Sequence, residues 1–285
     1  MTLVNASTDE ARRDLSGSGR DRWKGLVFSI FLYLCFAVAI GTLFALLVDL
    51  FVEGLPRLNT DLLTSFPSSK PEKAGAQSAF FGTIWLMVLV AVFTIPVGIA
   101  AAIYLQEYAD RTRWWNRLIE LNIQNLAAVP SIVYGILGLA FLARFLGLGF
   151  SVLAGALTLS LLVLPIVIIA SREAIKAVPD SIRQGSLALG ATQWQTIRHH
   201  VLPGAIPGMA TGAILALSRA IGEAAPLLLL GALTFITFNP DGLDSSFTAM
   251  PIQIFNWVSR PQEEFRTLAA AASIVLLVLL LLMNS

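Results

Sequence analysis

Arg219 and Glu223 carry the charges in the otherwise apolar stretch 206–232. Their i, i+4 spacing places them on one face of a helix, where they can pair. A charge inside a bilayer costs several kcal/mol unless it is paired or lines a polar cavity. From Pro207, about twelve helical residues rising about 1.5 Å each place Arg219 about 18 Å into the membrane, near its middle.

This pair has two interpretations. A guanidinium presents a planar fork of donors that suits a tetrahedral oxyanion and stays charged in a low-dielectric setting. Glu223 would then accept hydrogen bonds from a protonated phosphate or hold Arg219 when the site is empty. Alternatively, the pair neutralises itself and fixes helix packing. Because Pro226 cannot donate to the carbonyl of Gly222, we expect the helix to be weakened beside Glu223.

The whole chain has the composition of a polytopic, all-α membrane protein. Of its 285 residues, 56% are hydrophobic, and its mean hydropathy is +0.76. A soluble domain of this length would expose too much apolar surface. The single cysteine, Cys35, excludes an intramolecular disulfide. Apolar stretches of membrane-spanning length predict about six transmembrane helices: 25–52, 79–105, 121–146, 151–171, 206–232 and 267–283.

Lys and Arg gather in the N-terminal segment and in the connections after the second and fourth spans. The positive-inside rule makes these segments cytoplasmic, so both chain ends are expected to lie inside. Residues 1–22 are polar and predict a disordered cytoplasmic segment. Residues 23–285 are expected to form one transmembrane domain in a plasma membrane.

The long connection 172–204 predicts a structured cytoplasmic loop of two short helices. Pro179 suits a helix start, Gly190 suits a helix end, and Thr192 can cap a second helix that runs to Leu202-Pro203. His199 and His200 are adjacent, so their side chains diverge on a helix and predict no metal site. No G-x-x-x-x-G-K-[ST] motif occurs, which predicts no ATPase site in this chain.

This loop resembles the coupling loop of ABC importer permeases, whose pattern is E-A-A, three residues, G, nine residues, I, one residue, L-P. Gly190 and Leu202-Pro203 match it, whereas Gln184, Gly185 and Ser186 stand at E-A-A and His200 stands at I. The resemblance implies a type I ABC importer (MetI-like) permease fold with ATP and Mg bound on a partner ATPase. It also implies that the loop couples to that ATPase through Pro179, Asp180, Ile182, Arg183, Gln184, Leu187, Gly190, Leu202 and Pro203.

A second resemblance concerns the substrate. The run LSRAIGEAAPL around Arg219 and Glu223 resembles permease subunits of the high-affinity phosphate ABC importer, of the PstA type, as do residues 66–83 and 125–138. It implies half of a heterodimeric phosphate pathway, completed by a second permease subunit, an ATPase dimer and an extracytoplasmic phosphate-binding protein. No cofactor in this chain and no nucleic-acid partner are expected.

Other polar side chains of the matching blocks, Thr83, Ser131 and Tyr134, are candidates to line the pathway. Ser and Thr in membrane helices more often bond to backbone or to a neighbouring helix. Three alternatives stay open: a permease for another oxyanion such as molybdate or sulfate, a proton-coupled secondary transporter in which Glu223 carries protons, and a subunit that signals phosphate supply.

Overall fold

The computed structural model of the protein describes residues 19–110, 112–232 and 235–285. The chain separates into two compact units, Met1–Val52 and Glu53–Ser285. The first is dominated by α2 (Gly19–Gly54), a continuous helix that contains the expected first span and is long and apolar enough to cross a membrane. Of the expected N-terminal segment, residues 1–18 lie outside the described residues, and 19–22 already belong to α2.

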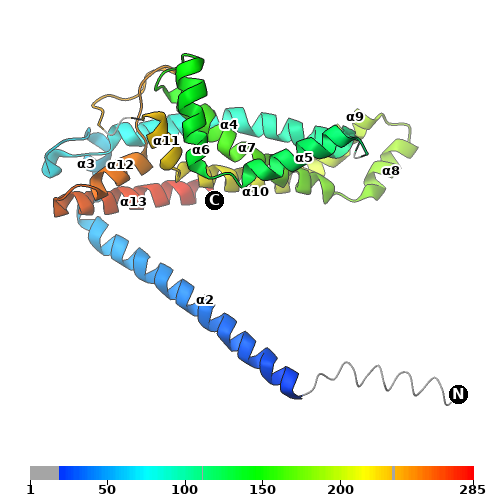
Figure 1. Cartoon of the computed structure of the whole chain (residues 1–285), viewed down its shortest axis with the longest axis horizontal. Helices are drawn as coiled ribbons and strands as arrows, with labels where there is room; N and C mark the ends of the chain where they lie inside the picture. Colours follow the sequence, from blue (N-terminus) through cyan, green and yellow to red (C-terminus); the bar gives the residue numbers. More distant parts are fainter. Residues whose placement is uncertain (1–18, 111, 233–234) are drawn as a thin grey trace. The chain divides into compact units, whose positions relative to one another are not determined.

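In the described part of the second unit, helices joined by loops are the regular secondary structure, and one isolated bridge joins Ser151 and Ser246. Figure 1 shows most of its long helices running side by side. Three labels, η3, η4 and η5, denote π-helical turns. The elements are η1 (Leu55–Arg57), α3 (Thr60–Thr64), η2 (Pro71–Lys73), α4 (Gln77–Ile103), η3 (Tyr104–Tyr108), α5 (Trp114–Ala127), α6 (Ser131–Leu137), η4 (Gly138–Phe145), α7 (Val152–Lys176), α8 (Asp180–Ala188), α9 (Gln193–Thr196), η5 (Ile197–Val201), α10 (Leu202–Ile221), α11 (Ala225–Leu230), α12 (Met250–Val258) and α13 (Glu263–Met283).

Five helical stretches of the described residues can cross a membrane by length and composition, and the pair α5 and α6–η4 makes a sixth if it is counted as one span. The prediction of a single helix over 121–146 was therefore wrong in detail. The two halves of this pair are bent by 105°. The bend lies just before Pro130, which has no N–H for a helical hydrogen bond and disfavours the α conformation in Val129.

The prediction of one continuous helix over 206–232 was also wrong. The long helix runs from Gln193 to Ile221, and α11 is a separate short helix. Pro226 lies in the first turn of α11, where its missing N–H costs nothing, instead of interrupting a continuing helix. Arg219 consequently lies in the last turn of α10 and not in the middle of a span.

Helix α7 lies at the centre of the unit and packs against both α4 and α10. Two glycines four residues apart allow α10 to approach it closely. A Cβ on Gly208 would lie 2.8 Å from the Cβ of Ala174, and Gly212 faces Ala170 one turn further on. Figure 1 places α8 and α9 at one end of these long helices, and α3 and α12 at the other end. We call the first the loop end.

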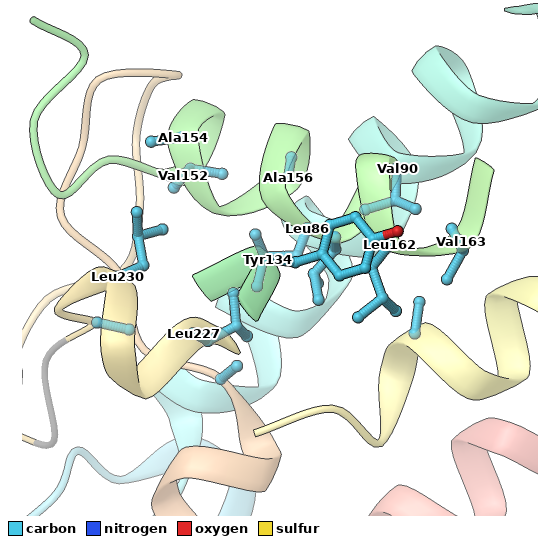
Figure 2. Close-up of a cluster of buried hydrophobic side chains, with 14 of the residues drawn as sticks. Leu86, Val90, Tyr134, Val152, Ala154, Ala156, Leu162, Val163, Leu227 and Leu230 are labelled. Carbon is cyan, nitrogen blue, oxygen red and sulfur yellow. The ribbon is translucent and has the colours of Figure 1, made fainter. Parts of the chain in front are cut away.

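The main apolar cluster joins side chains of α4, α6, α7 and α11. Figure 2 shows Tyr134 of α6 among Leu86 of α4, Leu162 of α7 and Leu227 of α11. The α6–α11 contact is close because Gly135 has no side chain: a Cβ there would lie 2.7 Å from the Cα of Pro226. This packing holds α11 and the chain break beside Glu223 against the bent α5–α6 pair.

Candidate functional site

Arg219 and Glu223 form the ion pair that their spacing predicts, but the pair is loose. Arg219 Nε lies 3.4 Å from Glu223 Oε1, and the two side chains are 46% and 18% exposed. Within the described residues this is the one hydrogen bond that the guanidinium makes. The remaining donors of Arg219 are therefore available to another group.

A break in the helix places this pair at the surface of the unit. After Ile221 the chain turns through Gly222, whose N–H donates to the carbonyl of Arg219. The N–H of Glu223 likewise donates to the carbonyl of Ala220 before α11 begins. These short-range bonds tighten the end of α10. The break thus turns the Arg219–Glu223 pair from a mid-helix feature into a helix-end feature.

A second polar pair lies one residue before Arg219. Asn284, which follows α13, donates from Nδ2 to Ser218 Oγ at 2.8 Å, and the Ser218 hydroxyl lies 3.1 Å from Asn284 Oδ1. The contact ties the residue after α13 to the last turn of α10, on a side of the helix different from that of Arg219 because adjacent side chains diverge. Sequence reasoning missed both residues, although a single Asn directly after an apolar span is a recognisable signal.

Tyr134 and Ser131, the two pathway candidates of α6, have different surroundings. The Tyr134 hydroxyl donates to the carbonyl of Leu126 at 2.8 Å and so spans the bend between α5 and α6. Its phenol also lies within electrostatic range of the Arg219 guanidinium. Ser131 is the first residue of α6 and is partly exposed. Of these two candidates, Tyr134 is the one within electrostatic range of Arg219.

Thr83 has a different position. Its side chain is buried, and its hydroxyl donates to the carbonyl of Ala79 and accepts the backbone N–H of Met250, both at 2.8 Å. The bond to Met250 satisfies a free N–H in the first turn of α12. This arrangement favours the structural alternative for Thr83 over a place in a pathway.

The loop contains the two short helices that its sequence predicts. Pro179 is the N-cap of α8, and Gly190 ends it with a φ of +85°. The N–H of Gly190 donates to Leu187, and the N–H of Ala191 donates to Ser186, which is a Schellman motif. Thr192 then caps α9 in a reciprocal capping box with Gln195. From α9 the helix continues through η5 into α10, past Leu202 and Pro203.

Four large apolar side chains of the loop are exposed. Ile182, Leu187, Leu189 and Trp194 are 42%, 49%, 91% and 52% exposed. Gln184, at the first E-A-A position, is also exposed. An exposed apolar face on a short, well-capped helix pair is typical of a docking surface.

Arg183 differs from the other loop residues because it points inward. It is 16% exposed and pairs with Glu107 of η3, 9% exposed, across 2.8 Å. It also pairs with Asp180, one helical turn earlier, across 3.1 Å. Sequence reasoning missed Glu107. This residue follows the second expected span, and no sequence pattern links it to Arg183 in the loop 172–204.

Further polar contacts surround this bridge at the loop end. Arg172 Nη1 lies 2.6 Å from Glu120, and its Nε donates to Gln106 at 3.4 Å. In the turn after η3, the Thr112 hydroxyl and N–H donate to the Asp110 carboxylate and lower its pKa. Among the described residues no group of three or more metal-ligating side chains occurs.

Comparisons with known proteins match most of the chain. The profile of the family described as binding-protein-dependent transport system inner membrane component matches residues 94–285. The probable ABC transporter permease protein YqgI of Bacillus subtilis is 32% identical over 81% of this chain and 76% of that protein. The phosphate transport system permease protein PstA 1 of Mycobacterium tuberculosis H37Rv is 33% identical over 85% of this chain and 79% of that protein.

Solved structures agree on the fold. A chain of a bacterial alginate ABC transporter superposes with a TM-score of 0.64 and 17% identity, over 92% of this chain and 95% of that one. A chain of the MetNI methionine ABC transporter superposes with a TM-score of 0.56 and 18% identity, over 71% and 86% of the two chains. The predicted all-α, MetI-like importer permease fold is confirmed.

Proposed function

This chain belongs to the family of inner membrane components of binding-protein-dependent transport systems, and from that premise we propose that it is a permease subunit of an ATP-driven, high-affinity importer of inorganic phosphate. It would form half of the translocation pathway. The phosphate assignment is supported by the relatives that are named phosphate transport permeases, with PstA 1 of Mycobacterium tuberculosis among them.

The observation that carries this proposal is the half-exposed guanidinium of Arg219, held by a single long bond to Glu223. An exposed arginine in a membrane protein faces a polar cavity, a partner or the membrane interface, because lipid would not solvate it. The Ser218–Asn284 pair lies in the same last turn of α10, and the phenol of Tyr134 is within electrostatic range of the guanidinium. The unused N–H donors of Arg219 could form hydrogen bonds with a negatively charged oxyanion as it passes the end of this helix.

The exposed apolar side chains of the loop supply the coupling surface in this proposal. A partner ATPase dimer, with its own ATP and Mg, would dock on Ile182, Leu187 and Leu189. The loop end would then be cytoplasmic, as the Lys and Arg distribution predicts, with both chain ends inside. A second permease subunit would complete the pathway, and a phosphate-binding protein would deliver phosphate to the α3–α12 end.

Reconstitution of the purified complex into liposomes tests the proposal. Uptake of radiolabelled phosphate, sulfate and molybdate is measured with ATP inside or outside the vesicles. We expect phosphate uptake that requires ATP on the loop side and is unaffected by sulfate and molybdate in tenfold excess. Uptake of another oxyanion in preference to phosphate would overturn the substrate assignment.

The same vesicles separate an ATP-driven importer from a proton-coupled transporter. A proton ionophore collapses the proton gradient and leaves ATP intact. We expect phosphate uptake to continue with the ionophore present. Uptake that disappears with the gradient and persists without ATP would make Glu223 a proton carrier and reject the ATP-driven mechanism.

A further inference from the structure

Arg183 is fully occupied within the chain, although it lies in the loop that is proposed to touch the ATPase. Its Nε and Nη2 donate to Glu107 Oε1 at 3.1 and 2.8 Å, and its Nη2 also donates to the carbonyl of Ile175 at 2.8 Å. Its Nη1 donates to the carbonyl of Val178 at 2.6 Å and to Asp180 at 3.1 Å. A guanidinium has five N–H donors. All of them are therefore used, and none is left for a partner subunit.

The second helix of the loop reaches the same residue. Gln193, the first residue of α9, donates from Nε2 to the backbone carbonyl of Glu107 at 2.6 Å. Glu107 is therefore held by α8 through its carboxylate and by α9 through its carbonyl. It lies in η3, a π-helical turn that ends a continuous helical stretch, Gln77–Tyr108. Single π-helical turns of this kind often occur at functional sites.

The backbone does not connect α4 directly to the loop that is proposed to move with the ATPase. The loop continues directly into α7 on one side and, through η5, into α10 on the other. Helix α4 has no such link, and it follows the loop through its packing against α7 and through polar contacts at its loop end, of which Glu107 is the one made directly to α8 and α9. At its far end, Thr83 accepts the N–H of Met250 and thereby holds the start of α12. About 24 residues of helix, or about 36 Å, separate Thr83 from Glu107.

We propose that Glu107 is the joint that fixes the loop end of α4 directly to α8 and α9, in addition to the packing of α4 against α7, and that Arg183 and Gln193 are the positioning residues that hold it. This inference rests on the proposed function, because it deepens the coupling step of that importer. A movement imposed on the loop end would be passed along α4 to α12 at the opposite end. Rigid helices joined by discrete contacts are the usual carriers of such coupling.

The test compares phosphate transported per ATP hydrolysed in reconstituted complexes. Glu107→Gln keeps the shape of the side chain but removes the charge that holds Arg183. Gln193→Leu removes the second attachment. We expect each variant to hydrolyse ATP while the phosphate-to-ATP ratio falls at least about fivefold, the lower end of typical coupling between sites. The double variant should show the lowest ratio.

Glu173→Gln is the matched control. It removes an ion pair to Lys176 at the same end of the molecule, but both of these side chains are more than half exposed. Its ratio should equal that of the unmodified complex. A Glu107→Gln complex that is thermally destabilised or poorly expressed but transports the normal amount of phosphate per ATP would overturn the proposal, because Glu107 would then be purely structural.

Failure of the proposed function would look different. The unmodified complex would then fail to accumulate radiolabelled inorganic phosphate at all. If the unmodified complex accumulates phosphate and the Glu107→Gln complex has the same phosphate-to-ATP ratio, the proposed role of Glu107 is rejected and the proposed function stands.

Discussion

Two arginine–glutamate pairs in this chain have the same chemistry and opposite surroundings. Arg183 and Glu107 are 16% and 9% exposed and lie 2.8 Å apart, and the arginine uses all its donors. Arg219 and Glu223 are 46% and 18% exposed and lie 3.4 Å apart, with one hydrogen bond between them. The first pair connects two segments 76 residues apart, and the second spans one helical turn.

The difference shows how to separate a structural pair from a functional one. A saturated, mostly buried pair has no donor left for a ligand, and removing its glutamate leaves donors of the arginine without their acceptor. A loose, exposed pair contributes little to stability but keeps donors available. By this criterion Arg183 and Glu107 serve the architecture and its movement, whereas Arg219 and Glu223 are suited to an anion.

Arg219→Ala gives the largest expected effect. Phosphate uptake should fall at least about 100-fold, which corresponds to a loss of about 2.7 kcal/mol in stabilisation of the bound anion. Assembly should stay intact, because the side chain is half exposed and makes one bond. The measurements are uptake in vesicles and the amount of complex that purifies with this chain.

Arg219→Lys is the informative companion variant. It keeps the charge but loses the planar fork, so uptake should be intermediate between those of the unmodified chain and Arg219→Ala. Normal uptake by Arg219→Ala would show that the Arg219–Glu223 pair has no role in phosphate transport.

The next effect concerns stability and contrasts the two glutamates. Glu107→Ala should lower the stability of the complex by about 1.5 to 3 kcal/mol, because two donors of the part-buried Arg183 lose their charged acceptor while Asp180 still pairs with it. Glu223→Ala should change stability by less than about 1 kcal/mol, because its partner is half exposed. Thermal unfolding of the two purified variants under identical conditions checks the contrast. Equal shifts in the unfolding midpoint would contradict it.

Thr83→Val should have a moderate effect on stability and none on transport. The substitution leaves the buried N–H of Met250 without its acceptor, which costs about 1 to 3 kcal/mol. Uptake per assembled complex, and the phosphate concentration at half-maximal uptake, should stay unchanged. A raised half-maximal concentration would place Thr83 in the pathway after all.

Local signals in the sequence predicted much of this fold. The apolar stretches located the membrane helices, and Pro179, Gly190 and Thr192 located the ends of the loop helices because caps act over a few residues. The i, i+4 spacing likewise predicted the Arg219–Glu223 contact. These features depend on interactions within about one helical turn.

The errors arose where hydrophobicity continued through a change of direction. Residues 121–146 and 206–232 look like single spans because their apolar character does not stop at the bend or the break. The Glu107 bridge was not predictable because 76 residues separate its partners. Contacts of this range depend on how the helices pack, and the order of residue types along the chain does not encode that directly.

Tyr134→Phe has the smallest expected effect. It tests whether Tyr134 stabilises the fold or also contributes to the proposed anion site. Its hydroxyl bridges the α5–α6 bend to the carbonyl of Leu126, yet its phenol lies in range of Arg219. Because the hydroxyl is already engaged and the ring is buried, we expect a stability loss of about 1 kcal/mol. Thermal unfolding and the phosphate dependence of uptake measure the two effects separately. An unchanged half-maximal phosphate concentration makes Tyr134 a residue that holds the bend, whereas a rise of several fold would extend the anion site from α10 to α6.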